Sequence, residues 1–234
     1  MRIEQVILYL LGPAAGYLLG SIPFGFVIGL ANGVDIRKVG SGNIGATNLG
    51  RALGRRFFFY AFLLDAAKGL LPVLAISLLA QSWRAGSLEV PLWAPLLTGG
   101  GALAGHLFPL YLRFKGGKGV ATGFGVVLGL WPVYTVAGLG AGAIFVLVVL
   151  GWRYISLASI VGALVFPLLV LYVGSSGKIC PPMEWRDLTP LLVVAGAFAL
   201  LIAWKHRGNI SRLRAGTEPK VGERKRAADN PVQK

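Results

Sequence analysis

Long apolar segments dominate the chain and leave few ways for it to fold. A helix crosses the hydrocarbon core of a bilayer with about 20 apolar residues, because each residue adds about 1.5 Å. Segments that reach or approach this length are 5–31, 57–81, 92–112, 119–131, 133–151, 155–174 and 188–204. Only 14% of the 234 residues are charged, against roughly 25% in soluble domains. We therefore predict an all-α, polytopic integral membrane protein with about seven transmembrane helices.

The number of spans depends on residues 119–151, where Trp131 and Pro132 interrupt one apolar stretch. If that stretch is a single kinked helix, the total falls to six. Cytoplasmic loops carry an excess of Lys and Arg. With seven spans and the N-terminus outside, 18 of the 23 Lys and Arg lie in the inside segments and four lie outside. Six spans would separate the basic 32–56 loop from the basic tail, so we predict seven, with a cytoplasmic C-terminus.

The organisation predicted is one transmembrane domain, residues 1–214, followed by a basic, disordered tail, residues 215–234, away from any site. The net charge is +14, which in a soluble protein would suggest nucleic acid. Here the positive charge flanks apolar segments, so it favours membrane lipid or an anionic substrate as the partner, and no nucleic acid. The single cysteine, Cys180, excludes an intrachain disulfide.

The first polar segment on the inside face is residues 40–51, with the sequence GSGNIGATNLGR. Its glycines allow a ligand to approach the backbone closely, and its exposed N–H groups can bind an anion. Its small hydroxyl and amide side chains are unusual for a simple loop. We therefore predict a functional role in preference to a flexible connection.

The second segment is Lys115-Gly-Gly-Lys118-Gly119, just before a predicted span. Two ammonium groups beside a bare backbone at a helix N-terminus suit a phosphate group. The spacing is not that of a Walker A loop, because Gly119 follows Lys118 where Ser or Thr would be required. Lysines that only set the membrane topology are the alternative.

The third group lies at the ends of two later spans. It contains Ser156 and Ser159 after Arg153, and His206 with Asn209 in the 205–212 segment. A helix cap and an interfacial side chain are the structural alternatives for these residues. We expect the three groups to converge on one cytoplasmic site.

Asp65 and Lys68 lie three residues apart inside the second predicted span. Ionisable groups in a membrane are costly and usually paired, so we expect an ion pair on one helix face that supports the site. The inside face before the tail offers too few carboxylates for a Mg²⁺ site, and no Ser-His-Asp pattern is present. We therefore expect no metal and no cofactor.

These blocks together resemble the bacterial membrane glycerol-3-phosphate acyltransferases that use acyl phosphate as donor, the PlsY family. The resemblance covers about residues 5–214 and rests on SGNIGATN at 41–48 with Arg51, GHLFP at 105–109, FKGGKGVAT at 114–122 and HRGNISRL at 206–213. It implies a seven-helix membrane fold in the bacterial inner membrane with a cytoplasmic active site. It also implies transfer of an acyl group to the sn-1 hydroxyl of glycerol 3-phosphate, which gives lysophosphatidic acid and phosphate.

By motif position, the resemblance implies catalytic roles for Ser41, Arg51, Lys118, Ser156, His206 and Asn209. It implies substrate binding by Gly42, Asn43, Thr47, Asn48, His106, Lys115, Gly116 and Gly117. Ser156 and Ser159 compete for one position. The partners implied are acyl phosphate, glycerol 3-phosphate and membrane lipid, with delivery of the donor from a soluble acyl-phosphate-producing enzyme.

Acyl phosphate is already activated, so the enzyme needs no strong nucleophile of its own. Arg51, Lys115 and Lys118 would neutralise phosphate charge, with loop N–H groups completing the cradle. Either His206 or a phosphate oxygen of a substrate would accept the hydroxyl proton. Two rival functions remain, an organic-phosphate transporter and a scaffold whose basic loops only bind anionic lipid.

Overall fold

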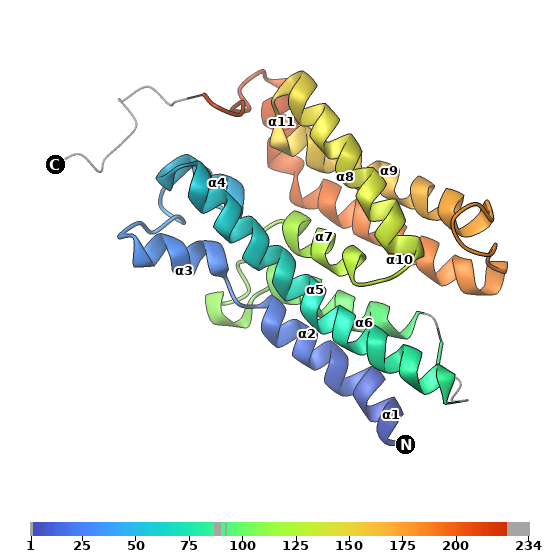
Figure 1. Ribbon diagram of the computed structural model, residues 1–234. Coiled ribbons are helices and arrows are strands. Elements are labelled where there is room, and N and C mark those ends of the chain that lie inside the picture. Colours follow the sequence, from blue (N-terminus) through green and yellow to red (C-terminus); the bar gives the residue numbers. More distant parts are fainter. Residues whose placement is uncertain (1, 87–89, 92, 224–234) are drawn as a thin grey trace.

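The computed structural model describes residues 2–86, 90–91 and 93–223, and all regular structure in these residues is helical (Figure 1). The elements are α1 (Ile3–Val6), a π-helical segment (Ile7–Leu11), α2 (Gly12–Gly20), α3 (Phe24–Ala31), α4 (Ala46–Leu53), α5 (Arg55–Ala85), α6 (Ala94–Leu107), a 3₁₀ turn (Leu110–Leu112), α7 (Val120–Leu128), α8 (Val133–Trp152), α9 (Ile155–Ser175), α10 (Trp185–Lys205) and α11 (Arg207–Arg214). The predicted all-α fold is confirmed.

Five helical segments within the described residues are long and apolar enough to cross a membrane: Ile3–Ala31, α5, α8, α9 and α10. The first of them bends between α2 and α3, where Pro23 precedes the new helix. Two of the predicted spans correspond to shorter helices, since α6 has 14 residues and α7 has nine. The count of seven spans and the orientation stay predictions.

The apolar stretch 119–151 forms two helices, as the preferred interpretation required. Helix α7 ends at Leu128, and α8 begins at Val133 after Trp131 and Pro132. Pro132 immediately precedes α8, a position where its fixed φ and missing N–H cost no helical hydrogen bond. The interpretation as one kinked helix is therefore wrong.

Small residues bring α2 and α6 into close contact. A methyl group at Gly16 would overlap the Thr98 carbonyl, and one at Gly105 would overlap the Tyr17 carbonyl. Large apolar side chains instead point outward from the bundle, for example Leu147 at 65% and Leu200 at 70% exposure. This arrangement, with small residues between helices and leucines outside, is that of a bundle surrounded by lipid.

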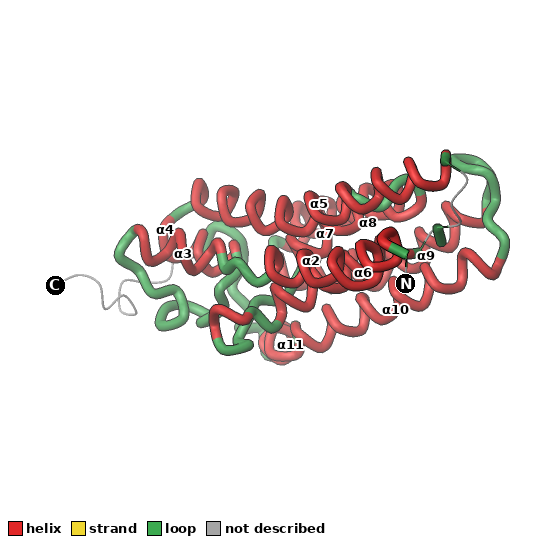
Figure 2. The backbone as a smooth tube through the Cα atoms, turned by 90° about the horizontal axis from the view of Figure 1, so that it is seen from below, coloured by secondary structure: helices red, strands yellow, loops and turns green. Residues whose placement is uncertain are grey.

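One end of the bundle collects the short helices and the polar loops. Figures 1 and 2 both place α3, α4 and α11 towards the end opposite to α1. Helix α7 packs against α5, α6 and α8, so it lies inside the bundle. The motifs predicted from sequence lie in the loops and helix ends at this end of the molecule.

Candidate active site

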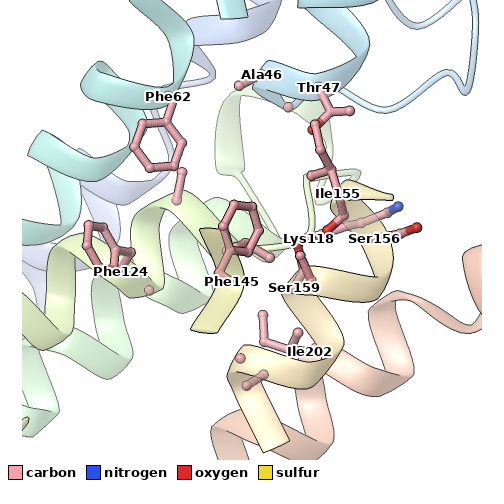
Figure 3. Close-up of a pocket in the computed structure, with 18 of the residues that line it drawn as sticks. Ala46, Thr47, Phe62, Lys118, Phe124, Phe145, Ile155, Ser156, Ser159 and Ile202 are labelled. Carbon is pink, nitrogen blue, oxygen red and sulfur yellow. Dashed lines mark hydrogen bonds between the residues drawn. The ribbon is translucent and has the colours of Figure 1, made fainter. Parts of the chain in front are cut away.

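A cavity of about 730 Å³ brings all six predicted catalytic residues together. Figure 3 shows how part of its lining is arranged: Thr47, Lys118 and Ser156 lie on one side, and aromatic rings such as Phe62, Phe124 and Phe145 line another part. The other predicted residues that line it are Ser41, Asn43, Asn48, Arg51, His106, His206 and Asn209. The expected convergence of the three polar segments is therefore confirmed.

The first polar segment is held by Asn48 from its own helix, α4. The Asn48 Oδ1 accepts a hydrogen bond from the Ser41 N–H at 2.9 Å, and its Nδ2 donates to the carbonyls of Ile36 and Val39 at 2.8 and 3.1 Å. Gly42 has φ +68°, which favours glycine. The Asn48 amide is thus engaged with the loop itself, and it presents Ser41 to the cavity.

The loop predicted to bind phosphate, Lys115–Gly119, which we call the phosphate loop, leads directly into the N-terminus of α7. Two residues before it, Arg113 and Phe114, adopt left-handed φ of 49° and 63°. Such strain in residues that carry side chains is found mainly at functional sites. The Gly117 N–H donates to the His106 carbonyl at 3.1 Å, so the loop rests on the end of α6.

Lys118 and Arg51 are cations that line the first cavity. The Lys118 ammonium donates to the Asn209 side-chain oxygen, which joins the phosphate loop to α11. Burial lowers the Lys118 pKa to about 8, with Arg212 and Arg51 adding to the effect and Glu218 opposing it. The group is therefore still mainly charged at pH 7 and is weakly solvated, which strengthens its interaction with an anion.

His206 lies between α10 and α11 with its ring oriented by the backbone. Its Nδ1 is 2.8 Å from the Ile202 carbonyl, which assigns the proton to Nδ1 and leaves Nε2 as an acceptor. Burial, together with the positive charge of Lys118, lowers the His206 pKa to about 4. The ring is thus neutral at pH 7 and can orient a hydroxyl, although it is a weak base.

Glu218 is the site residue that motif comparison missed. Its Oε1 accepts hydrogen bonds from Ser156 at 2.8 Å and Asn209 at 2.6 Å, and its Oε2 accepts from Arg212 at 2.7 Å. Burial raises its pKa, but these hydrogen bonds outweigh that and leave the pKa below the ordinary value. Glu218 therefore stays ionised and fixes two of the predicted catalytic side chains.

The beginning of the tail lies against the site, which corrects the expectation that the whole tail stays away from it. Arg51 donates to the Pro219 carbonyl at 3.3 Å, and Val221 exchanges two hydrogen bonds of 2.7 Å with Arg153. The charge of Glu218, surrounded by donors from α9 and α11, explains why these residues are ordered. The predicted disorder of residues 224–234 lies outside the described part of the chain.

The two competing serines differ in what their hydroxyl groups contact. The Ser156 hydroxyl donates to Glu218, whereas the Ser159 hydroxyl donates to Ile155 O, one turn earlier in its own helix, at 2.8 Å. Both line the cavity. The hydrogen bonds favour Ser156 as the serine that belongs to the polar site.

A second cavity of about 540 Å³ adjoins the first, because both are lined by Ser41, Asn43, Lys118 and Asn209. It contains the predicted residues Gly42, Lys115 and Gly116. Further basic side chains line it as well, namely Arg37, Lys205, Arg207 and Arg212, and no carboxylate from the described part of the chain does. An anion is the ligand that such a lining favours.

Among the described residues, no group of three or more His, Cys, Asp or Glu side chains could hold a metal ion. Clusters of this kind coordinate Mg²⁺ or Zn²⁺ in proteins. Whether the reaction proceeds without metal stays a prediction for experiment.

The first cavity has a polar end, lined by Ser41, Arg51, Lys118 and Asn209, which we call the mouth. The rest of the cavity, which we call the depth, is apolar. Its lining there comes from α5, α7, α8, α9 and α10, and includes Phe62, Phe124, Phe145, Phe166 and Phe198. Leu63 on α5 and Leu139 on α8 also line it and are 60% and 54% exposed. The cavity thus opens sideways between α5 and α8, on a face that lipid would cover.

A family model described as glycerol-3-phosphate acyltransferase matches residues 10–216. A glycerol-3-phosphate acyltransferase from Trichlorobacter lovleyi is 46% identical over 88% of this chain and 94% of its own length. One from Parasynechococcus marenigrum is 42% identical over 90% of this chain and 89% of its own length.

Two crystal structures of PlsY, described as an integral membrane glycerol 3-phosphate acyltransferase, are also similar. The glycerol 3-phosphate form has 37% identity and a TM-score of 0.75 over 92% of this chain and 96% of its own. The lysophosphatidic acid form has 36% identity and a TM-score of 0.73 over 92% and 95%. The family match spans most of the chain, including all the motifs that form the cavity, and the protein described here is an integral membrane protein that belongs to the glycerol-3-phosphate acyltransferase family.

Proposed function

We propose that the protein transfers a fatty acyl group from acyl phosphate to the sn-1 hydroxyl of glycerol 3-phosphate, giving lysophosphatidic acid and inorganic phosphate. The observation that carries this proposal is the continuity of a cationic mouth with an apolar depth in one cavity. A second, basic cavity shares the mouth. This arrangement suits two phosphate groups, which would bind at the basic side chains, and one acyl chain, which would lie against the apolar lining.

The two cavities suggest separate places for the two substrates. The acyl chain would lie in the apolar depth with its acyl phosphate group at Lys118, and glycerol 3-phosphate would occupy the basic cavity. Ser41 and Asn209 line both cavities, so they lie where the two substrates would meet. Holding the hydroxyl next to an activated carbonyl is itself a large contribution to the rate.

The bond changes are those of an acyl transfer. The sn-1 oxygen attacks the carbonyl carbon, its proton leaves, and the carbon–oxygen bond to phosphate breaks, so that inorganic phosphate departs. His206 Nε2 would accept a hydrogen bond from the sn-1 hydroxyl of glycerol 3-phosphate and so orient the attacking oxygen. A phosphate group has a second pKa of about 6, so a substrate phosphate is a better proton acceptor than His206 with its pKa of about 4. We infer that the proton passes to a phosphate oxygen.

The location proposed is the bacterial inner membrane, with the site facing the cytoplasm. The support is the excess of Lys and Arg in the segments predicted to lie inside. The lateral opening between α5 and α8 would admit an acyl chain from the bilayer. Delivery of the donor from a soluble acyl-phosphate-producing enzyme to that leaflet is part of the same proposal.

The test is a product assay with purified protein in lipid mesophase or detergent, supplied with palmitoyl phosphate and glycerol 3-phosphate in EDTA. We expect lysophosphatidate and inorganic phosphate in equal amounts, with phosphate release that depends on glycerol 3-phosphate. Palmitoyl-CoA in place of palmitoyl phosphate tests the donor. If well-folded protein yields no product with either donor, with or without added metal, the enzyme assignment is wrong and the transporter becomes the leading alternative.

A further inference from the structure

Three ionisable side chains are buried beside the phosphate loop, and the proposed reaction uses none of them directly. Two of them, Asp65 and His106, also form part of the lining of the first cavity. Asp65, Lys68 and His106 are each no more than 5% exposed. They come from α5 and from the last turn of α6. Burying charge among membrane helices is costly, and residues placed there usually serve the function.

The three side chains form one connected group. Lys68 Nζ lies 2.8 Å from Asp65 Oδ1 and donates to the Ile22 carbonyl at 2.6 Å, at the bend between α2 and α3. His106 Nδ1 lies 3.8 Å from the same Asp65 oxygen, which is beyond hydrogen-bond distance but close for a buried carboxylate and imidazole. Lys68 thus fixes Asp65, and Asp65 faces the His106 ring.

The other side of His106 supports the phosphate loop. Its carbonyl accepts the Gly117 N–H at 3.1 Å. A methyl group on Gly117 would overlap the imidazole Nε2, so the ring lies directly against the Gly117 backbone. A methyl group on Gly116 would overlap the His106 carbonyl. The position of His106 therefore determines where the loop backbone lies.

We propose that Asp65 and His106 are positioning residues for the phosphate loop: the Asp65 carboxylate, held by Lys68, orients the His106 ring, and His106 sets the position of Gly117 and thereby of Lys118. His106 then acts by supporting the loop, in place of the direct substrate contact that the motif implied. This inference rests on the proposed function, since it assumes that the loop binds a substrate phosphate. A displacement of about 1 Å in such a site can cost about 100-fold in rate.

The test compares His106→Gln, Asp65→Asn and their double variant with wild type. The readouts are kcat, the KM of each substrate and the Kd of inorganic phosphate measured by calorimetry. We expect His106→Gln to raise the KM of the substrate held by the loop and the Kd of phosphate about tenfold, with a smaller change in kcat. Asp65→Asn should raise the same KM severalfold. In the His106→Gln background it should add nothing, because Asp65 acts through His106.

A further variant separates positioning from folding. Asp65→Asn combined with Lys68→Met removes both charges, so no uncompensated charge stays buried and the Tm should return towards wild type. The KM and the phosphate Kd should stay raised. Return of the Tm, the KM and the phosphate Kd to wild-type values would show that the Asp65–Lys68 pair is only structural. Additive effects of Asp65→Asn and His106→Gln on the KM would equally overturn the inference. If wild type binds phosphate but transfers no acyl group, the proposed function fails, while the phosphate Kd values still decide this inference.

Discussion

The mouth and the depth of the cavity are built in different ways. The mouth is made of loops and helix ends, and its side chains are held by hydrogen bonds, as Asn209 is by Glu218 and Lys118. The depth is made of helix faces and is lined mainly by rings and small residues. Recognition of phosphate depends on direction and charge, whereas burial of an acyl chain depends on area and volume. Changes at the mouth should therefore alter rate, and changes in the depth should alter the preference for chain length.

The largest effect is expected for Lys118→Ala at the mouth. Losing a preorganised charged donor in a buried site typically costs about 100- to 1,000-fold in kcat. The steady-state rate of lysophosphatidate formation measures the loss. Lys115→Ala should cost much less, because Lys115 is exposed. Arg186→Ala, with a side chain that is 80% exposed, is the matched control and should behave as wild type. Equal rates for wild type and Lys118→Ala would contradict a catalytic mouth.

The depth should respond through chain length. A side chain at Gly142 on α8 would enter the cavity, since its Cβ would lie 3.2 Å from the Phe124 ring. Gly142→Leu should displace about two methylenes of the acyl chain, at about 0.8 kcal/mol each, and lower the preference for palmitoyl over octanoyl phosphate about tenfold. The ratio of the two kcat/KM values is the measurement. Leu147→Phe, on the exposed side of the same helix, should leave the ratio unchanged.

The pH dependence of kcat/KM should show the titration of Lys118 at the mouth. Lys118, with its pKa lowered by burial to about 8, is charged below that pH and loses its charge above it. We expect kcat/KM to fall above about pH 8, by about tenfold for each further pH unit. Lys118→Arg should retain some activity and move this limb to higher pH, because a guanidinium stays protonated. An unchanged limb in that variant would show that another group titrates.

Glu218→Gln tests whether the start of the tail is part of the mouth. The variant keeps the shape but loses the charge that holds Asn209 and Arg212, so it should lower the free energy of unfolding by about 1–3 kcal/mol. The Tm of the purified protein and the kcat should both fall. Glu184→Gln, whose side chain is 75% exposed, is the control. Removal of the tail from residue 216 without loss of activity would contradict this role.

The smallest difference is expected between the two serines. Ser156→Ala removes the hydrogen bond to Glu218 and should reduce kcat/KM severalfold, because a buried acceptor loses a partner. Ser159→Ala removes only a bond to the backbone of its own helix and should have little effect. The opposite order in the two kcat/KM values would assign the site serine to position 159.

The sequence predicted the mouth much better than the depth. The sequence motifs pointed to Ser41, Lys118, His206 and Asn209, which all line the cavity. Such motifs are recognisable because only a few residue types bind phosphate well. Phe145 on α8 and Phe198 on α10 are ordinary apolar residues in long apolar segments, and only helix packing brings them to one cavity. Periodicity in a uniformly apolar helix does not show which face meets the substrate.

The tail shows a different limit of sequence-based prediction. Glu218 lies in a short polar segment with the composition of a disordered tail. Its order comes from nearby donors on α11 together with Ser156 on α9, which is 62 residues away in the chain. The sequence did offer one chemical signal, since Glu218 is the first carboxylate after the basic residues and Asn209 of segment 205–214. The bend between α2 and α3 was likewise not evident from hydropathy alone.

The most direct test of the account is the location of the donor's acyl chain. A palmitoyl phosphate analogue with a diazirine at the chain end would be irradiated with wild-type protein in the absence of glycerol 3-phosphate, and labelled peptides would be mapped by mass spectrometry. We predict labelling of the cavity lining on α7, α8 and α9, near Val127, Gly138 and Phe166, that unlabelled palmitoyl phosphate suppresses. Labelling confined to α2 or α6, or insensitive to the competitor, would contradict a single cavity that joins the cationic mouth to an apolar depth.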